Sequence, residues 1–328
     1  MPTTNASADA DTSARMRERH RVAVLVPCYN EAATIADVVA GFRAALPGSV
    51  VYVYDNNSTD KTIEVARAAG AVVRREAHQG KGYVVRRMFA DVDADVYVLV
   101  DGDATYDAPS ARAMIARLIE ERLDMVLAAR VDREEAAYRR GHRAGNRLLS
   151  GFVTHIFGQS FTDMLSGYRA FSRRFVKSFP VLSGGFEIET ELTIHALELE
   201  LPVAEVNTPY YARPQGSASK LNTWRDGLRI LLTILKIYRS ERPLPLFSAV
   251  GLALGAIAIG LAIPIVITYL EQGIVPRFPT AILSTGLMLS ALLSIACGLV
   301  LDTVTRGRRE AKLLAYLRHG APGEPAQT

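Results

Sequence analysis

Two carboxylates stand two positions apart at Asp101 and Asp103, with Gly102 between them. The glycine relaxes the backbone, so both side chains can point toward one hard divalent cation. Such a cation neutralises the charge that develops on a departing nucleoside diphosphate. Many turns contain an Asp-x-Asp sequence without any metal, but the apolar residues 96–100 before this one predict a buried strand and favour a metal site.

A second polar cluster, Asp55-Asn56-Asn57, follows the β-branched residues 50–54. In a doubly wound sheet a base or ribose lies at this position, which favours Asp55 as a ligand for a nucleoside. The alternative is a turn that Asp55 closes with its own side chain. We expect Ser58-Thr59-Asp60, which come next, to cap a helix.

These clusters each come directly after a predicted strand. Strands over 22–26, 50–54, 71–74, 96–100 and 125–129 alternate with helices over 33–46, 61–69, 82–92 and 110–121. This order predicts an α/β class with right-handed crossovers and a Rossmann-like, mostly parallel sheet. Ligands bind beyond the carboxyl ends of such strands, so three clusters should line one crevice: Asn30-Glu31, Asp55-Asn56-Asn57 and Asp101-Gly102-Asp103.

The common nucleotide-binding motifs of α/β proteins are absent from the sequence. The first strand is followed by Pro27-Cys28-Tyr29-Asn30-Glu31, without the glycine fingerprint of a dehydrogenase. The sequence also lacks a phosphate loop with Gly-Lys-Ser or Gly-Lys-Thr. The turn Gly80-Lys81-Gly82 could still bring a cation and backbone N–H groups to a phosphate.

Basic residues gather after residue 131, where the alternation stops and we expect a loop leading into a helix. A phosphate oxygen is already ionised at neutral pH, so as a nucleophile it needs positioning by positive charge more than it needs a base. We expect at least one arginine between Arg130 and Arg147 to touch such an acceptor. A solvated loop or a patch for anionic lipid is the alternative. The residues are Arg139, Arg140, His142, Arg143 and Arg147.

Two uncharged stretches, residues 246–270 and 278–301, are each long enough to cross a hydrocarbon core about 30 Å thick. A core helix of a soluble protein seldom runs this far without a polar face. Basic residues flank both stretches, and the loop between them carries one Glu and one Arg. By the positive-inside rule the large N-terminal domain and both termini are cytoplasmic. The flanking residues are Arg225, Arg229, Lys236, Arg239, Arg242, Arg306, Arg308, Arg309 and Lys312.

The 328 residues divide into five predicted parts: a disordered tail (1–20), a catalytic domain (21–221), a juxtamembrane amphipathic helix (222–243), a membrane hairpin (244–304) and a basic cytoplasmic tail (305–328). The first part lacks the apolar segment of a signal peptide. The basic face of residues 224–238 favours the membrane interface, with packing on the catalytic domain as the alternative. Cys28 and Cys297 fall in a strand and a span, which argues against a disulfide.

Six segments in order make residues 22–221 resemble the inverting family-two glycosyltransferases of the GT-A fold. Within that family they resemble the dolichyl-phosphate mannose and glucose synthases and their bacterial undecaprenyl-phosphate relatives. The segments are Val26-Pro27-Cys28-Tyr29-Asn30-Glu31, Asp55-Asn56-Asn57-Ser58-Thr59-Asp60, Gly80-Lys81-Gly82, Asp101-Gly102-Asp103, Leu165-Ser166-Gly167-Tyr168-Arg169, and Arg213 through Ser219-Lys220-Leu221.

The resemblance implies roles for particular residues. Asp101 and Asp103 would hold Mg²⁺ or Mn²⁺ against the donor diphosphate, and Asp163 is similar to an acidic residue near the reacting centre. The nucleoside pocket would consist of Pro27, Tyr29, Glu31 and Asp55, with Lys81 nearby. The residues that would bind the acceptor phosphate or the donor diphosphate are Arg130, Arg143, Arg213 and Lys220.

Several of these residues have plain structural alternatives. Asp163 could cap a helix or pair with a cation. Glu187, Glu189 and Glu191 open a helical pattern, where acidic residues favour the helix dipole; the resemblance makes Glu187 or Glu189 a partner for sugar hydroxyls. The mannose synthases often carry Gln where this chain has Thr105, so a third protein ligand to the metal and the sugar preference do not carry over.

Our hypothesis from the sequence is a membrane-anchored, metal-dependent hexosyltransferase. A polyprenyl phosphate, undecaprenyl or dolichyl, attacks the anomeric carbon of a nucleotide-sugar, with a UDP-sugar preferred over a GDP-sugar, and yields a lipid-linked sugar for cell-envelope or protein glycosylation. A processive polysaccharide synthase is the rival enzyme, but its Gln-x-x-Arg-Trp motif is missing around Trp224. An inactive membrane scaffold is the other alternative. The sequence is compatible with a homo-oligomer and lacks an aromatic platform for nucleic acid.

Overall fold

The computed structural model describes residues 20–132, 151, 161–185, 187–212, 239 and 241–322. The tail predicted before residue 20 and the amphipathic helix predicted over 224–238 lie outside these ranges. In chain order the elements are β1 (Val22–Cys28), α2 (Ile35–Ala45), β2 (Val50–Asp55), α3 (Thr62–Ala68), β3 (Val72–Arg75), α4 (Lys81–Asp91), β4 (Val96–Leu99), α5 (Ser110–Glu120), β5 (Met125–Asp132), β6 (Arg169–Ser172), α7 (Arg173–Ser178), α8 (Ile188–Glu198), β7 (Val203–Tyr210), α10 (Pro243–Gln272) and α11 (Phe278–Leu317).

One mixed sheet organises the described part of the N-terminal domain, with its strands in the order β3-β2-β1-β4-β6-β5-β7. Strand β1 pairs in parallel with β2 and β4, β2 pairs in parallel with β3, and β5 pairs in parallel with β7. Only β6, among the described strands, runs antiparallel to its neighbours β4 and β5. The predicted mostly parallel α/β sheet is therefore confirmed, whereas β6 and β7 were not predicted.

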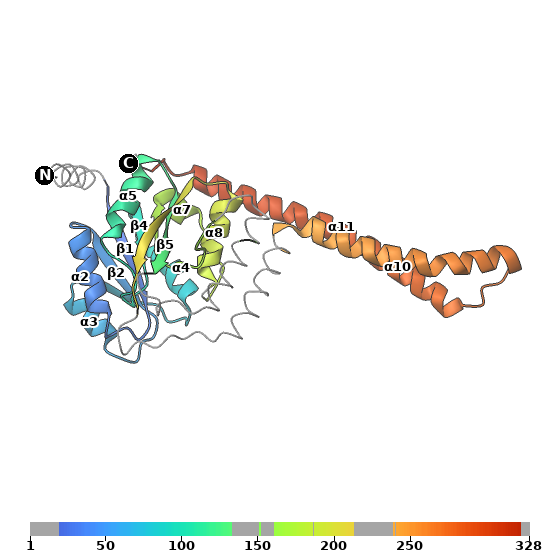
Figure 1. Cartoon of the computed structure of the whole chain (residues 1–328), viewed down its shortest axis with the longest axis horizontal. Coiled ribbons are helices and arrows are strands. Elements are labelled where there is room, and N and C mark those ends of the chain that lie inside the picture. The colour runs from blue at the N-terminus through green and yellow to red at the C-terminus, as the bar shows by residue number, and fades with distance from the viewer. Residues whose placement is uncertain are drawn as a thin grey trace. The chain divides into compact units, whose positions relative to one another are not determined.

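Helices cover both faces of this sheet, as Figure 1 shows. Helices α2 and α5 pack with the β1 side chains of Val24 and Val26 in one apolar core. On the other face, α4, α7 and α8 meet through aromatic rings: Phe89 contacts Phe171 of β6, and Phe175 contacts His195 of α8. All four residues of β4 and all four of β6 are buried, as expected for strands covered on both sides.

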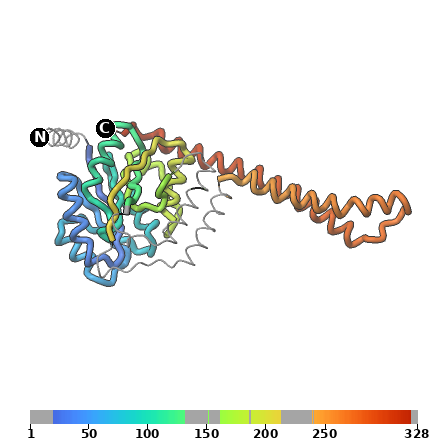
Figure 2. Tube along the Cα trace, in the orientation of Figure 1, coloured from blue at the N-terminus to red at the C-terminus, as the bar shows by residue number. Residues whose placement is uncertain are grey.

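Helices α10 and α11 follow the sheet domain in the chain and form a hairpin (Figure 2). Their apolar windows have mean hydropathies of 2.6 and 2.1 and are each only 11% buried within the protein, so both helices could cross a membrane. The seam between the two helices uses small residues, because Gly251 lies against Ile295 and Gly298 against Phe247. Ser284 donates a hydrogen bond to the carbonyl of Ala258 (2.8 Å).

The chain forms two compact units. The first comprises Met1–Gly227 together with Lys312–Thr328, and the second comprises Leu228–Ala311. Helix α11 continues beyond the uncharged stretch predicted over 278–301 and ends at Leu317. Its last turns therefore belong to the same unit as the sheet, which the sequence did not indicate.

A buried histidine gives the sheet domain a predicted acid sensitivity. His195 is 1% exposed, and burial lowers its pKa to about 3, with a smaller contribution from Lys312. In the unfolded chain His195 takes up a proton near pH 6.5, whereas in the folded chain it stays neutral at that pH. The free energy of unfolding therefore falls as the pH drops below about 6.5. We expect His195→Leu to reduce this fall in thermal unfolding experiments on the solubilised protein.

The histidine prediction has a matched control. Phe179→Leu changes a ring that packs against His195 and carries no titratable group, so it should keep the wild-type dependence on pH. An unchanged pH dependence in His195→Leu would contradict the assignment.

Candidate active site

The carboxyl ends of β1, β2 and β4 bring the three predicted polar clusters together. The backbone N–H of Asn56 donates to the carbonyl of Cys28 (2.9 Å), which joins the ends of β2 and β1. The Thr34 hydroxyl donates to the carbonyl of Gly102 (2.7 Å) and to Glu31 Oε2 (3.2 Å), which joins the ends of β1 and β4. The clusters thus lie at one edge of the sheet.

Asp55 is fully buried at the end of β2 and closes a tight turn. Its two carboxylate oxygens accept from the backbone N–H of Ser58 at 3.3 and 3.2 Å. This is the turn that the sequence offered as the alternative to ligand binding. The residue that directly precedes α3 is Lys61, which makes no side-chain cap, whereas Asp60 Oδ1 accepts from the N–H of Thr62 (3.0 Å), the first residue of the helix.

The remaining residues of the predicted nucleoside pocket surround this turn. Pro27 and Glu31 are half-buried, and Tyr29 is exposed. The N–H of Glu31 donates to the hydroxyl of Thr62 (2.9 Å), so the start of α3 fixes the backbone after β1.

Lys81 lies between two carboxylates in the centre of this edge. Its Nζ is 2.5 Å from Asp101 Oδ1 and 2.5 Å from Glu189 Oε1. Burial lowers the pKa of Lys81, but the two carboxylates outweigh burial and hold the pKa above its usual value. The side chains of Lys81 and Glu189 are buried, whereas Asp101 remains 31% exposed and can meet a ligand from solvent.

Asp103 is nearly buried and accepts hydrogen bonds from Thr105, the position at which the mannose synthases often carry Gln. The hydroxyl of Thr105 donates to Asp103 Oδ1 at 2.6 Å, and the Thr105 N–H donates to the same oxygen at 3.3 Å. Among the described residues no group of three or more His, Cys, Asp or Glu side chains could hold a metal. Asp101 and Asp103 fit Mg²⁺ or Mn²⁺ where substrate phosphates and water supply the other ligands, as is common for these ions.

Glycines let three loops approach one another at this site. A Cβ atom on Gly80 or Gly82 would collide with the backbone oxygens of the facing loop at Gly184 and Ser183. A Cβ atom on Gly167 would collide with the carboxylate of Asp101. The Gly80-Lys81-Gly82 turn and the Ser-Gly-Tyr-Arg segment therefore need glycine because the chain packs too closely around Lys81 and Asp101 to admit a Cβ atom.

Asp163 and Arg130 form a second ion pair at the end of β5. The Arg130 Nε and Nη2 atoms donate to the two oxygens of Asp163 at 2.6 and 2.7 Å. Glu205 of β7 holds the turn in place by accepting from the N–H groups of Thr162 (2.8 Å) and Asp163 (3.3 Å). The Arg130 guanidinium also lies over the ring of Tyr210. The salt-bridge alternative for Asp163 is the arrangement present here.

The acidic residues at the start of α8 have different surroundings. Glu187 is the residue before the helix, Glu189 binds Lys81, and Glu191 accepts from the N–H groups of Leu182 and Ser183 at 2.8 Å each. Glu191 therefore anchors the loop that faces the Gly80-Lys81-Gly82 turn. The predicted site residues Arg143, Arg213 and Lys220 lie outside the described residues.

Arg169 supports the loop at Gly167, a role that the sequence did not indicate beyond its place in the Ser-Gly-Tyr-Arg motif. It is fully buried, and burial lowers its pKa to about 10. The guanidinium donates to the carbonyls of Met164 (2.6 Å) and Ser166 (3.0 Å) and so shapes the loop that brings Gly167 to Asp101. The Ser-Gly-Tyr-Arg pattern marked this segment in the sequence. Only the structure shows that the arginine is buried and donates hydrogen bonds to backbone carbonyls.

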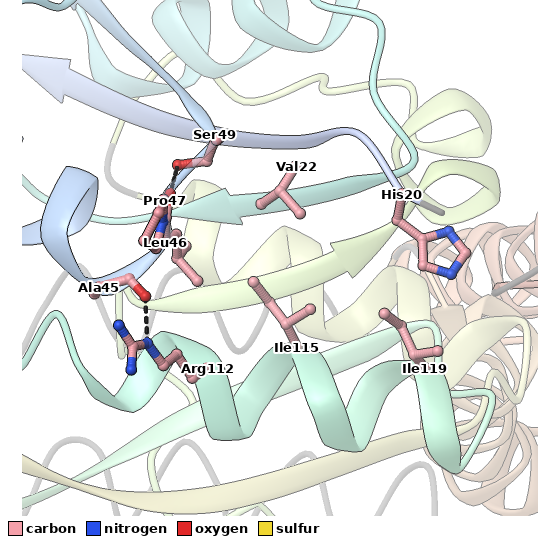
Figure 3. A pocket seen from close by; sticks show the side chains of 10 residues that line it. His20, Val22, Ala45, Leu46, Pro47, Ser49, Arg112, Ile115 and Ile119 are labelled. Carbon is pink, nitrogen blue, oxygen red and sulfur yellow. Dashed lines mark hydrogen bonds between the residues drawn. The ribbon is translucent and has the colours of Figure 1, made fainter. Parts of the chain in front are cut away.

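Two cavities distinguish the edges of the sheet. A cavity of about 230 Å³ lies beside Asp101 and is also lined by Tyr106, Asp107 and Tyr211. A mainly apolar cavity of about 120 Å³ lies at the opposite edge, where Val22 begins β1, and its lining includes none of the predicted site residues (Figure 3). Of these two cavities, the one at the carboxyl edge of the sheet is therefore the one that adjoins the predicted site residues.

Comparisons with known proteins show which proteins this chain is similar to. The profile of the family described as "Glycosyl transferase family 2" matches residues 23–179. "Glycosyltransferase AglJ" of Haloferax volcanii is 36% identical over 291 residues, which cover 88% of this chain and 95% of that protein. A "Dolichyl-phosphate hexose transferase" of the same organism is 28% identical over 221 residues, which cover 67% of this chain and 95% of the relative.

Solved structures share the same fold. The glucosyl-3-phosphoglycerate synthase of Mycobacterium tuberculosis, in complex with Mn²⁺, UDP-glucose and phosphoglyceric acid, superposes with a TM-score of 0.56 at 24% identity. The superposition covers 71% of this chain and 85% of that chain. The sheet domain therefore has the GT-A fold.

The close approach of Gly167 to Asp101 gives a prediction. Gly167→Ala places a methyl group against the Asp101 carboxylate, which can move toward solvent because it is partly exposed. We expect release of nucleotide from a nucleotide-sugar donor to fall roughly 100-fold, because small displacements of reacting groups are costly. Thermal unfolding should change little.

Gly307→Ala is the matched control for Gly167→Ala, since nothing lies within 4 Å of the position of its Cβ. Wild-type turnover in Gly167→Ala would show that Asp101 does not need its observed position.

Proposed function

The chain belongs to glycosyl transferase family 2, and we propose that it transfers a hexose from a nucleoside diphosphate sugar to a polyprenyl phosphate at the cytoplasmic face of a membrane. One observation carries the proposal. Asp101 and Asp103 stand at the carboxyl edge of the sheet, and an arginine fixed by a carboxylate stands at the end of β5. The first pair suits a donor diphosphate with its metal, and the arginine suits the phosphate of an acceptor.

On the donor side, the partly exposed Asp101 and the adjoining Asp103 would hold Mg²⁺ or Mn²⁺ against the diphosphate. When bound, the cation neutralises the charge that grows on the departing nucleotide. Lys81 already lies 2.5 Å from Asp101 and places a positive charge at the same point. The complex of the synthase from M. tuberculosis with Mn²⁺ and UDP-glucose supports this assignment and favours a UDP-sugar over a GDP-sugar.

The rest of the donor would lie along the ends of β1 and β2. The half-buried and exposed residues there could enclose a nucleoside, while α8 faces the sugar. Glu189 is bound to Lys81, so Glu187 is the more accessible partner for sugar hydroxyls. The proposed nucleoside pocket consists of Pro27, Tyr29, Glu31 and Asp55.

On the acceptor side, Arg130 would orient the attacking phosphate. Both oxygens of Asp163 hold the guanidinium, so Arg130 keeps one orientation and loses little entropy when it binds a phosphate. A phosphate oxygen is ionised at neutral pH and needs no base. Attack from the side opposite the diphosphate inverts the anomeric carbon. Arg143, Arg213 and Lys220 are proposed as further phosphate contacts.

The polyprenyl part of the acceptor is supported by the two apolar helices and by the relatives. Helices α10 and α11 could cross a bilayer, which is where a polyprenyl chain is found. A dolichyl-phosphate hexose transferase is among the relatives that match two thirds of this chain. Basic residues on both flanks of the hairpin favour a cytoplasmic catalytic domain.

The metal assignment predicts that Asp101→Asn with Asp103→Asn lowers transfer at least about 1000-fold, because the charge on the departing diphosphate is no longer neutralised. Incubation of membranes with a radiolabelled nucleotide-sugar and extraction into organic solvent measures the lipid-linked product. Asp93→Asn is the control, since Asp93 is exposed and pairs with Arg21. Wild-type labelling in the double variant would refute the assignment, and label in polymer would indicate a polysaccharide synthase.

The positioning of Arg130 predicts a split between kinetic constants. In Asp163→Asn the guanidinium loses its charged partner, so KM for the polyprenyl phosphate should rise roughly 10- to 100-fold. KM for the donor should stay near wild type, and the pH profile of kcat should keep its shape. If Asp163 acts as a base instead, kcat falls and the acidic limb of the profile disappears.

A further inference from the structure

The last turns of α11 are packed into the sheet domain through polar contacts. Lys312 Nζ lies 2.5 Å from Glu198 Oε2 at the end of α8. One turn later, the Tyr316 hydroxyl donates to Asp124 Oδ2 (2.9 Å) just before β5. Both carboxylates are buried, with Glu198 5% and Asp124 0% exposed. All four residues belong to one compact unit.

Lys312 is the cation that pairs with Glu198. The other carboxylate oxygen of Glu198, Oε1, is buried and has no hydrogen-bond partner among the described residues. Its neighbour His195, one helical turn earlier, is neutral because burial lowers its pKa to about 3. A buried carboxylate without a cation is strongly destabilising, so Lys312 supplies what the sheet domain lacks at this point.

Asp124 is compensated within the sheet domain itself. Arg174 donates to its two oxygens at 2.6 and 2.9 Å, and the Ser172 hydroxyl donates at 2.6 Å. The ring of Tyr316 covers the Arg174 guanidinium with 4.7 Å from its CZ atom to the ring centroid. Tyr316 therefore completes an existing charge cluster, whereas Lys312 is the only cation that pairs with Glu198 within the described part of the chain.

Helix α8 connects these contacts to the candidate active site. It begins at Ile188, so Glu189 lies in its first turn and binds Lys81 beside Asp101, while Glu198 is its last residue. Nine residues separate the two glutamates, which is about 13 Å along the helix, and they point to opposite sides. Each end of this buried helix is thus fixed by one glutamate–lysine pair.

We infer that Lys312–Leu317 is a docking segment of the catalytic domain, and that its ion pair with Glu198 anchors the far end of the helix that carries Glu189. Transferase activity then depends on the last six residues of α11, which lie beyond its uncharged stretch. If both apolar stretches cross the bilayer, the sheet domain and the segment after Lys312 lie on the same side.

The ion pair is tested with the full-length solubilised protein and three variants. Lys312→Met leaves the buried carboxyl group of Glu198 without its cation, and we expect the unfolding midpoint of this variant to fall by roughly 5–10 °C. Glu198→Gln should cost less, because the Lys312 side chain is 20% exposed and can reach water. Combining the two substitutions removes both charges and should recover most of the lost stability.

Arg318→Met is the matched control, since Arg318 is exposed one residue beyond α11. A wild-type midpoint in Lys312→Met would overturn the inference. A combined variant no more stable than Lys312→Met would also overturn it. These measurements need no assay of sugar transfer, so they stand even if the proposed function fails.

The link to the active site is tested by donor kinetics below the unfolding temperature of each variant. Lys312→Met should raise KM for the nucleotide-sugar at least about threefold, and Lys312→Arg should restore the wild-type value because it keeps the charge. Unchanged donor KM in a destabilised Lys312→Met protein would show that α8 does not carry the effect.

Discussion

The candidate active site depends on one buried cation between two carboxylates. Asp101 follows β4 and Glu189 lies in the first turn of α8, and each is 2.5 Å from Lys81 Nζ. Without the lysine, two negative charges would face each other in a site whose proposed substrates are also negatively charged. The glycines around Lys81 follow from the same constraint, because the loops at Gly80, Gly82 and Gly184 can enclose the ion pair only by touching through their backbones.

The same principle recurs elsewhere in the sheet domain. Asp163 holds Arg130 at the end of β5, and Glu198 meets Lys312 at the end of α8. At each place a buried acid fixes a long basic side chain that would otherwise be flexible. In the proposed reaction, Lys81 and Arg130 thereby place positive charge where the donor diphosphate and the acceptor phosphate must approach each other despite their like charges. Lys312 lies at the other end of α8 and acts only on the helix.

Sequence patterns predicted the first five strands and the edge at which ligands bind, because each strand is an apolar run that ends in polar residues. They did not predict β6, which has four residues beginning with Arg169 and ending with Ser172 and lacks a distinctive pattern. Strand β7 contains Glu205, Asn207 and Pro209, which lower its apparent strand propensity. Their burial and pairing come from the rest of the sheet.

The role of a site residue could be predicted from the sequence only where all the residues that share the role lie in one short segment. Asp101 and Asp103 are neighbours in sequence, so their shared role could be proposed. Lys81 and Glu189 are separated by 108 residues, and Glu198 and Lys312 by 114, so only the fold reveals these pairs. The same applies to Asp163, which could be described as either a reacting group or a salt-bridge partner until Arg130 was found to bind both of its oxygens.

The central claim is that Asp101 and Asp103 form a metal site that is complete only with a nucleoside diphosphate. Titration of the wild-type protein with Mn²⁺, followed by electron paramagnetic resonance with and without UDP, tests it most directly. Because Lys81 holds Asp101 and the protein supplies few ligands, we expect weak Mn²⁺ binding alone and at least about tenfold tighter binding with UDP. Equal Mn²⁺ affinity in the presence and absence of UDP would contradict the account.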